Sequence, residues 1–146
     1  MTQTDRMTVL VVDDDPDVLL ALSRRLHAAG FEVVTASSGA EALELIGCHT
    51  VNAITLDVSL PGEMNGLELA AALRRNPRTA ETPIVFVTGT VDSDFKEKCT
   101  AVGGEYFLAK PYDADVLIRL LDGIFGQDEL AEIRRISEAK RRQPTR

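Results

Sequence analysis

The sequence has no tryptophan, and only two cysteines and two histidines occur among its 146 residues. Cys48 and Cys99 do not form a CxxC pair, and together with His27 and His49 they lack the spacing of zinc ligands. A lone cysteine is usually a small buried side chain, so we expect structural roles for all four residues. The sequence therefore predicts neither a disulfide scaffold nor a zinc site.

Long hydrophobic runs are also absent. No run approaches the ~18 apolar residues that a membrane span needs, and the polar start MTQTDRM does not resemble a signal peptide. The composition, 45% apolar and 27% charged, is ordinary for a globular protein, and 146 residues suit a single domain that needs no disulfides. We therefore expect a cytoplasmic protein with no membrane partner.

Basic charge is scarce over most of the chain. Residues 1–126 contain 19 acidic and 10 basic residues, a net charge of −9, whereas residues 127–146 contain four acidic and six basic residues, a net charge of +2. Affinity for nucleic acid comes from neutralising phosphates with lysine and arginine. We therefore expect no nucleic-acid partner, and an acidic body of this kind is suited to hold a cation.

Several familiar site motifs are missing as well. No serine or cysteine nucleophile is paired with a histidine, which argues against a hydrolase triad. No GxGxxG and no P-loop is present to bind the phosphates of a nucleotide. The loop after the first apolar run is acidic and would repel the phosphate of a flavin.

Short apolar runs alternate strictly with segments of helical period. The runs that predict strands are Val9–Val12, Phe31–Ala36, Val51–Leu56, Ile84–Val87 and Tyr106–Leu108. The predicted helices cover 16–29, a segment that starts at a Ser38–Glu41 capping box, 67–75, the stripe 95–102 and the stripe 116–124. An eight-unit barrel is excluded because it needs ~250 residues. We therefore predict an α/β fold with a doubly wound five-stranded parallel sheet of flavodoxin-like order 2-1-3-4-5.

Polar side chains follow four of the five predicted strands, at the edge where such sheets bind ligands. The first strand ends in Asp13–Asp15, the third in Asp57 and the fourth in Thr88, and Lys110 follows the fifth. Carboxylates within ~5 Å of one another repel by several kcal/mol, and a hard divalent cation relieves that repulsion. A few carboxylates plus water is how proteins usually hold Mg²⁺, so we expect a Mg²⁺ site at this edge.

Each of these residues also has a plain structural interpretation. Asp15 is suited to cap the following helix, and Asp57 is suited to be a cap or turn residue. Threonine is common in strands, which accounts for Thr88, and Lys110 is explained as a solvated surface lysine. One helix cap needs one side chain, however, so capping does not explain three consecutive acids. The predicted topology favours a site because it brings all these strand ends together.

Four segments resemble the receiver domain of two-component response regulators, over roughly residues 7–126. VLVVDDDPDV resembles the first strand and acidic pair of that family, and LDVSLPGEMNGLEL its phosphoacceptor strand and the loop that follows. PIVFVTGT resembles its fourth strand with a hydroxyl residue, and YFLAKPY its Lys-Pro signature. We therefore expect a receiver domain over 1–126 and a C-terminal extension over 127–146.

The resemblance implies a role for each site residue. Asp57 would be the phosphorylated aspartate, and Mg²⁺ would be held by Asp13, Asp14, Asp57 and the backbone carbonyl of Ser59. Asp14 would be a direct ligand, and Asp13 would act largely through water. The donor would be a phosphohistidine on a sensor histidine kinase or a phosphotransfer protein.

Three further residues would carry the response to phosphorylation. Thr88 would be the switch hydroxyl and Lys110 the phosphate-binding lysine. Phe107 would be the switch aromatic, although it lacks the hydroxyl of tyrosine, and a plain core aromatic is the alternative. The phosphoryl charge is expected to remodel the surface of the fourth helix, fifth strand and fifth helix, which would control binding of a downstream protein target or a homodimer contact.

The residues that flank the site bear on the lifetime of the acyl phosphate. The resemblance implies that Ser59 and Thr90 line the path of the attacking water, and we expect Gly89, next to Thr88, to leave the phosphoryl group open to solvent and partners. Because neither Ser59 nor Thr90 offers a carboxylate or carboxamide, we expect fast loading by small donors and an intermediate rate of self-dephosphorylation. The loop Pro61–Gly66 is one residue longer than the commonest family pattern.

Several alternatives remain open. The chain is either a single-domain regulator or a receiver from a longer regulator or hybrid kinase. Residues 127–146 carry Leu130, Ile133 and Ile136 before a basic end, and they extend the last helix, pack on the body, form a dimer seam or fray. A Mg²⁺-dependent aspartyl phosphatase is disfavoured because such enzymes have a second acid two residues past the nucleophile, where this chain has Ser59. An interaction-only domain is disfavoured by the complete set of site residues, and we expect no stand-alone enzyme.

Overall fold

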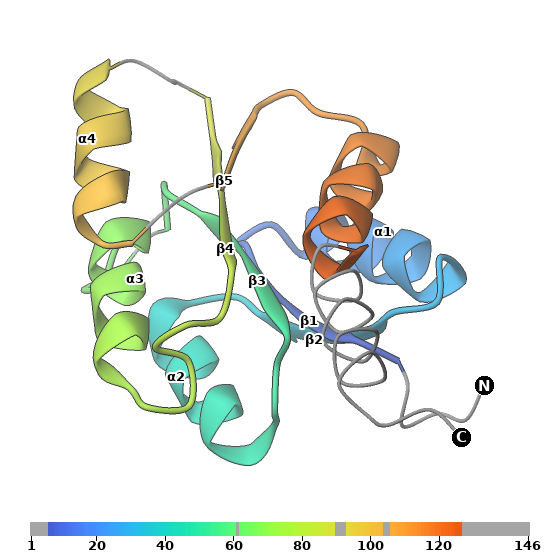
Figure 1. Cartoon of the computed structure of the whole chain (residues 1–146), viewed down its shortest axis with the longest axis horizontal. Helices are drawn as coiled ribbons and strands as arrows, with labels where there is room; N and C mark the ends of the chain where they lie inside the picture. Colours follow the sequence, from blue (N-terminus) through green and yellow to red (C-terminus); the bar gives the residue numbers. More distant parts are fainter. Residues whose placement is uncertain (1–5, 61, 90–92, 104–105, 127–146) are drawn as a thin grey trace, which may run out of the picture.

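A computed structural model of the chain describes residues 6–60, 62–89, 93–103 and 106–126 (Figure 1). The elements are β1 (Thr8–Val12), α1 (Pro16–Ala28), β2 (Glu32–Ala36), α2 (Gly39–Cys48), β3 (Ala53–Asp57), α3 (Gly66–Arg75), β4 (Ile84–Thr88), α4 (Ser93–Ala101) and β5 (Tyr106–Ala109). Residues 114–126 are also helical and are called the last helix. The extension predicted over 127–146 lies outside the described residues.

The five strands form one parallel sheet in the order β2-β1-β3-β4-β5. Every residue of β3 and β4 is buried, as expected for strands covered on both faces. The order reverses between β1 and β3, so the carboxyl ends of these two strands flank the switch point of the sheet. The predicted doubly wound fold is confirmed.

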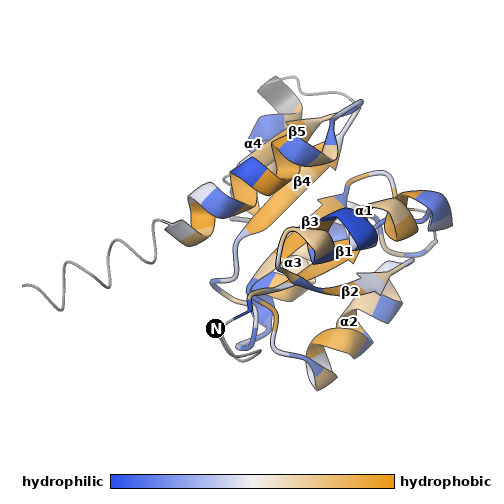
Figure 2. Cartoon of the chain, turned by 90° about the vertical axis from the view of Figure 1, so that its right-hand side faces the viewer, coloured by the Kyte–Doolittle hydropathy of each residue, from blue (hydrophilic) through white to orange (hydrophobic). Residues whose placement is uncertain are grey.

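Helices cover both faces of the sheet: α2, α3 and α4 lie on one face, and α1 and the last helix on the other (Figure 1). Alternate residues of the strands point to opposite faces, which separates the core into two clusters. One cluster contains Leu10, Ile54 and Phe86 and packs against α2, α3 and α4. The other contains Val9, Val11 and Val85 and packs against α1 and the last helix. The strands at the centre of the sheet are mostly orange in Figure 2, whereas the helices carry blue as well as orange segments.

The helix starts agree with the sequence in part. Asp15 caps α1 by accepting the N–H of Asp17, so the capping interpretation of Asp15 is borne out. Ser38 caps α2, but the box predicted there is incomplete, because the carboxylate of Glu41 accepts the N–H of Ser37 rather than that of Ser38. The complete capping box is at α3, between Asn65 and Glu68, and the sequence analysis had missed it.

Three strands extend further than the apolar runs predict. β3 includes Asp57, β4 includes Thr88 and β5 includes Ala109. The reason is that backbone pairing continues past the apolar run, since the N–H of Val58 still donates to the carbonyl of Val87 at 3.1 Å. Asp57 and Thr88 therefore lie on the last residues of strands, whereas Asp13, Asp14 and Lys110 follow directly after β1 and β5.

The two cysteines are free and differ in environment. Cys99 lies on α4 and is buried, and burial raises the pKa of its thiol to about 11, which fits the expected structural role. Cys48 ends α2 and is exposed, so the expectation of a buried side chain is wrong there. Among the helices that the structure describes, none is long and apolar enough to cross a membrane.

Candidate functional site

Asp57 occupies the carboxyl end of β3, and its side chain is almost fully buried, at 3% exposure. Its Oδ1 accepts the N–H of Ser59 at 2.9 Å, which fixes one carboxylate oxygen. The loop then returns to α3 at Gly66, whose N–H donates to the carbonyl of Val58 at 3.1 Å. A Cβ at Gly66 would lie 2.6 Å from both the carbonyl oxygen of Asp57 and the Cα of Val58, so only glycine permits this approach. The backbone that carries Asp57 is thus held against the start of α3.

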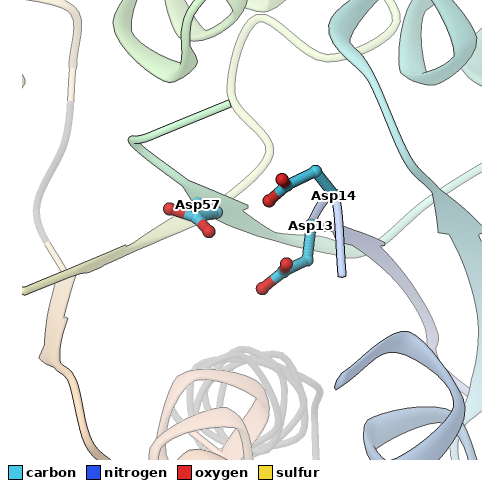
Figure 3. Close-up of side chains that lie close together, drawn as sticks. All are labelled: Asp13, Asp14 and Asp57. Atoms are coloured by element: carbon cyan, nitrogen blue, oxygen red, sulfur yellow. The ribbon is translucent and has the colours of Figure 1, made fainter. Parts of the chain in front are cut away.

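Two further carboxylates follow β1 at the other side of the switch point. Asp13 is buried, its N–H donates to the carbonyl of Ala36 at 3.1 Å, and its Oδ1 accepts the N–H of Asp15 at 2.9 Å. Asp14 is exposed. One carboxylate oxygen from each of Asp13, Asp14 and Asp57 lies within 4.8 Å of the others, and Figure 3 shows the three side chains grouped at the ends of β1 and β3.

A cation of the protein lies beside this acidic cluster. The ammonium of Lys110 donates to Oδ2 of Asp57 at 2.8 Å, and the backbone N–H of Lys110 donates to the carbonyl of Thr88 at 2.7 Å. Thr88 is buried at the end of β4, one residue beyond the Val87 that pairs with Asp57. The sheet register therefore brings together all four strand ends that the sequence analysis singled out.

Burial, hydrogen bonds and neighbouring charges together set the pKa of Asp13 and of Lys110. Burial raises the pKa of Asp13, and the neighbouring charges of Asp57 and Asp14 add to this, while the N–H of Asp15 and the charge of Lys110 lower it. Burial alone would lower the pKa of Lys110, but the hydrogen bond to Asp57 and the charges of the three aspartates outweigh burial and raise it. Lys110 is therefore a permanent ammonium near neutral pH.

The donor set suits a small, hard divalent cation. Three carboxylates, two of them buried, present oxygen atoms within a few ångströms of one another, and one lysine does not neutralise them. Oxygen ligands of this kind, completed by water, are what Mg²⁺ prefers. Ser59 lies exposed in the turn after Asp57, so its carbonyl as a ligand remains a prediction.

Phe107 occupies the middle of β5 and is half-buried. Its ring stacks on Phe86 with centroids 6.1 Å apart, and it makes a T-shaped contact with Phe95 on α4 with centroids 6.5 Å apart. These contacts make Phe107 part of the core in this structure, and a switching role stays a prediction. Of the flanking residues, Gly89 is exposed with open space around its Cα, whereas Thr90 and Pro61 lie outside the described residues.

One neighbour of the site was missed by the sequence analysis. Tyr112, two residues after Lys110, lines a cavity of about 580 Å³ together with Asp13 and Lys110. Burial, followed by the charges of Asp13 and Asp57, raises the pKa of its phenol to about 12. The only available signal was its position just past the end of the fifth strand.

Fold and site together define a class. The molecule is a doubly wound α/β protein with an acidic cluster and a contact between a lysine and a buried aspartate at the switch point of its sheet. Residues 9–122 match the model of the response regulator receiver domain, and the chain belongs to this family. It is therefore a receiver domain of two-component systems, a family of regulatory domains rather than of stand-alone enzymes.

Known relatives agree with this assignment. The transcriptional regulatory protein KdpE of Mycobacterium tuberculosis is 33% identical over 113 residues, which cover 77% of this chain and 48% of KdpE. The chain spans about half the length, or less, of the curated relatives it matches. Among solved structures, the chemotaxis response regulator CheY4 of Vibrio cholerae is 33% identical with a TM-score of 0.77, over 82% of this chain and 98% of CheY4.

A third relative is informative about the acidic cluster. The receiver domain of the sensor histidine kinase PA1611 from Pseudomonas aeruginosa is 27% identical with a TM-score of 0.71, over 83% of this chain and 98% of that domain. Its structure has a magnesium ion coordinated in the active-site cleft. The sequence-based resemblance to receiver domains is thus confirmed.

Proposed function

We propose that this chain accepts a phosphoryl group on Asp57 from a phosphohistidine of a sensor histidine kinase or a histidine phosphotransfer protein, in a Mg²⁺-dependent reaction. The observation that carries the proposal is the contact of Asp57 with Lys110 at 2.8 Å inside a cluster of three carboxylates. Self-phosphorylation and self-dephosphorylation are the only reactions proposed for the chain itself, and the cytoplasm is the expected compartment.

In the proposed transfer, a carboxylate oxygen of Asp57 attacks phosphorus, the P–N bond to the donor imidazole breaks, and a P–O bond to Asp57 forms. Phosphoryl transfer depends mainly on positioning and on neutralising the spread-out charge of the transition state. The N–H of Ser59 holds Oδ1 of Asp57, and the ammonium of Lys110 is placed to neutralise one phosphoryl oxygen. Mg²⁺, held by Asp13, Asp14, Asp57 and the Ser59 carbonyl, would supply the remaining positive charge.

The proposed response follows from the added charge, about −1.5 to −2 near pH 7. Thr88 ends β4 beside Asp57, and a phosphoryl oxygen is a strong acceptor for its hydroxyl. Thr88 and Phe86 point to the same face of β4, and Phe107 on the neighbouring strand stacks on Phe86 and contacts Phe95 of α4. This face of the sheet is the proposed route from Thr88 to α4. We propose that the surface of α4, β5 and the last helix changes and alters binding of a downstream protein target.

The role of the chain within a larger system belongs to the same proposal. We assign residues 1–126 to the receiver domain and 127–146 to a C-terminal extension. Homodimer contact is proposed through α4, β5 and the last helix, or through the extension. Ser59, Gly89 and Thr90 are proposed to set the access of water to the acyl phosphate.

Intact mass measurement after incubation with acetyl phosphate tests the reaction. The expected result is a phosphate-sized mass gain that requires Mg²⁺ and is lost in Asp57→Asn. Asp122→Asn, which removes an exposed carboxylate from the last helix, is the matched control and should be modified like the wild type. A gain that persists without Mg²⁺ or in Asp57→Asn would contradict the proposal.

A further inference from the structure

The acidic cluster opens on one side into a cavity of about 580 Å³ between α1 and the last helix. Asp13 and Lys110 line its inner end, and Val18 and Leu22 of α1 line its apolar wall. Arg25 of α1 forms an ion pair with Asp115 of the last helix at this cavity. The cavity therefore joins the proposed metal site to a groove whose walls belong to the second core cluster.

Tyr112 lies where these two regions meet, and its backbone is fixed from both sides. Two residues earlier, Lys110 is tied to β4 through the carbonyl of Thr88. One residue later, Asp113 caps the last helix by accepting the N–H of Asp115 at 3.1 Å. The tyrosine ring packs against the second core cluster, while the residue lines the cavity that contains Asp13. A side chain held in this way has little freedom left to lose on forming one more hydrogen bond.

The polar atoms of Tyr112 and Asp13 complement each other. Within the described part of the chain, the Tyr112 hydroxyl has no hydrogen-bond partner. Of the two carboxylate oxygens of Asp13, Oδ1 accepts a hydrogen bond there and Oδ2 does not. No fully buried side-chain polar atom among these residues lacks a partner, so the Tyr112 hydroxyl and Oδ2 of Asp13 both keep contact with solvent, and both residues line the cavity. A tyrosine phenol is protonated at neutral pH and can therefore donate a hydrogen bond.

We propose that Tyr112 is a positioning residue of the acidic site, whose hydroxyl holds Oδ2 of Asp13 by a hydrogen bond through one bridging water. This bond holds Asp13 in the orientation that receives a divalent cation and its water shell. The inference rests on the proposed Mg²⁺ site and extends it by one residue. Removing a group that hydrogen-bonds to a metal ligand without touching the metal typically lowers metal affinity by about tenfold or more. The loss is smaller where water can replace the missing group.

Mg²⁺ titration of Tyr112→Phe tests the hydroxyl alone, because phenylalanine keeps the ring and its packing. Tyr106→Phe is the matched control: Tyr106 begins β5 and lines a different cavity, with Arg74 and Gly103. By isothermal titration calorimetry, we expect Tyr112→Phe to bind Mg²⁺ about three- to tenfold more weakly than the wild type. Tyr106→Phe should bind like the wild type, and the melting temperature without Mg²⁺ should be the same in all three.

A spectroscopic readout separates a positioning role from a packing role. The chain has no tryptophan and two tyrosines, so Tyr112 is the sole fluorophore of its class in Tyr106→Phe. Its emission should change on Mg²⁺ addition with the midpoint found by calorimetry, and this change should be lost in the Tyr106→Phe, Asp13→Ala double variant. A packing role would leave the emission insensitive to both.

The outcomes distinguish this inference from the proposed function. Equal Mg²⁺ affinity of Tyr112→Phe and wild type, or emission that does not follow Mg²⁺, overturns the role of Tyr112 and leaves the proposed function intact. A wild type that binds no Mg²⁺ overturns both.

Discussion

Asp13 and Asp14 are neighbours in sequence, yet only Asp13 is removed from water. A buried carboxylate beside two others resists ionisation, which is the physical cause of the raised pKa of Asp13. Lys110 compensates part of this charge, and its contact is with Asp57. Without a bound cation, the ionised carboxylates therefore lower the free energy of unfolding, and Asp13 is the clearest source of this effect.

Asp13→Asn is expected to raise the stability of the Mg²⁺-free protein at pH 7. Because the pKa of Asp13 is raised in the folded state, the folded protein binds its proton more tightly, and ionisation of Asp13 lowers stability as pH rises above the ordinary value of 3.8. The gain from asparagine should therefore be largest near neutral pH and vanish as pH falls below that value. Urea unfolding at several pH values measures it.

Asp122→Asn is the control for this prediction, since it removes one exposed carboxylate from the last helix. The stability gain should be larger in Asp13→Asn than in Asp122→Asn at pH 7. Equal gains would mean that net charge, and not burial of Asp13, causes the effect.

At the scale of elements, the start of α3 determines how β3 presents Asp57. The Asn65–Glu68 capping box fixes the first turn, and Gly66 lies against the backbone of Asp57 and Val58. The sequence pattern did predict the apolar strands and the helices that follow them, because burial on one or both faces imposes a period on the residues. A capping box involves only two polar residues, so it is a weak signal in a sequence. The pair Asn65–Glu68 was not predicted because Asn65 falls in the Pro61–Gly66 segment, which was interpreted as a loop.

Other features of the elements depend on contacts between distant segments and were not predictable from the sequence. Arg74 donates to the carbonyls of Thr79 and Thr82 and reaches Gly103, which ties the loop before β4 to the end of α4. Tyr112 and Asp13 line one cavity because the sheet places only β3 and β4 between β1 and β5. The acidic residues at the strand ends were predictable because the carboxyl ends of parallel strands lie at one edge of the sheet. That placement does not depend on which side chains they contact.

Gly66→Ala is expected to destabilise the protein by about 1–3 kcal/mol, because the added methyl group would overlap backbone atoms that cannot move aside freely. Gly47→Ala in α2 is the matched control, because a Cβ there meets no atom within 4 Å. Alanine should stabilise that helix position by up to about 1 kcal/mol. Chemical denaturation compares the two variants, and equal stability would show that the approach of α3 to Asp57 is not tight.

At the scale of the whole molecule, the site couples metal binding to folding. The three carboxylates come from two strands that are brought together only in the folded sheet, so a bound cation stabilises the native state. The same arrangement explains why residues far apart in the chain, from Asp13 to Lys110, act on one group. Phosphorylation would add charge at this junction of β1, β3, β4 and β5.

Mg²⁺ at about 10 mM, a concentration suited to weak sites of few carboxylates, is expected to raise the melting temperature of the wild type. A tenfold excess over Kd corresponds to about 1.4 kcal/mol of added stability. Asp14→Ala should lose this response while melting no lower than the wild type without Mg²⁺, because it removes repulsion from the cluster. A wild-type melting curve that Mg²⁺ does not move would contradict the assignment of the cation site.

The most direct test of the account is to locate the phosphoryl group after treatment with acetyl phosphate and Mg²⁺. Borohydride reduces an acyl phosphate to an alcohol, and peptide mass mapping then identifies the reduced residue. We predict reduction at Asp57 alone, dependent on Mg²⁺ and absent from protein that was not treated with acetyl phosphate. Reduction at Asp13 or Asp14 instead, or no reduced aspartate in protein that has gained a phosphate-sized mass, would contradict the claim that Asp57 is the phosphoacceptor.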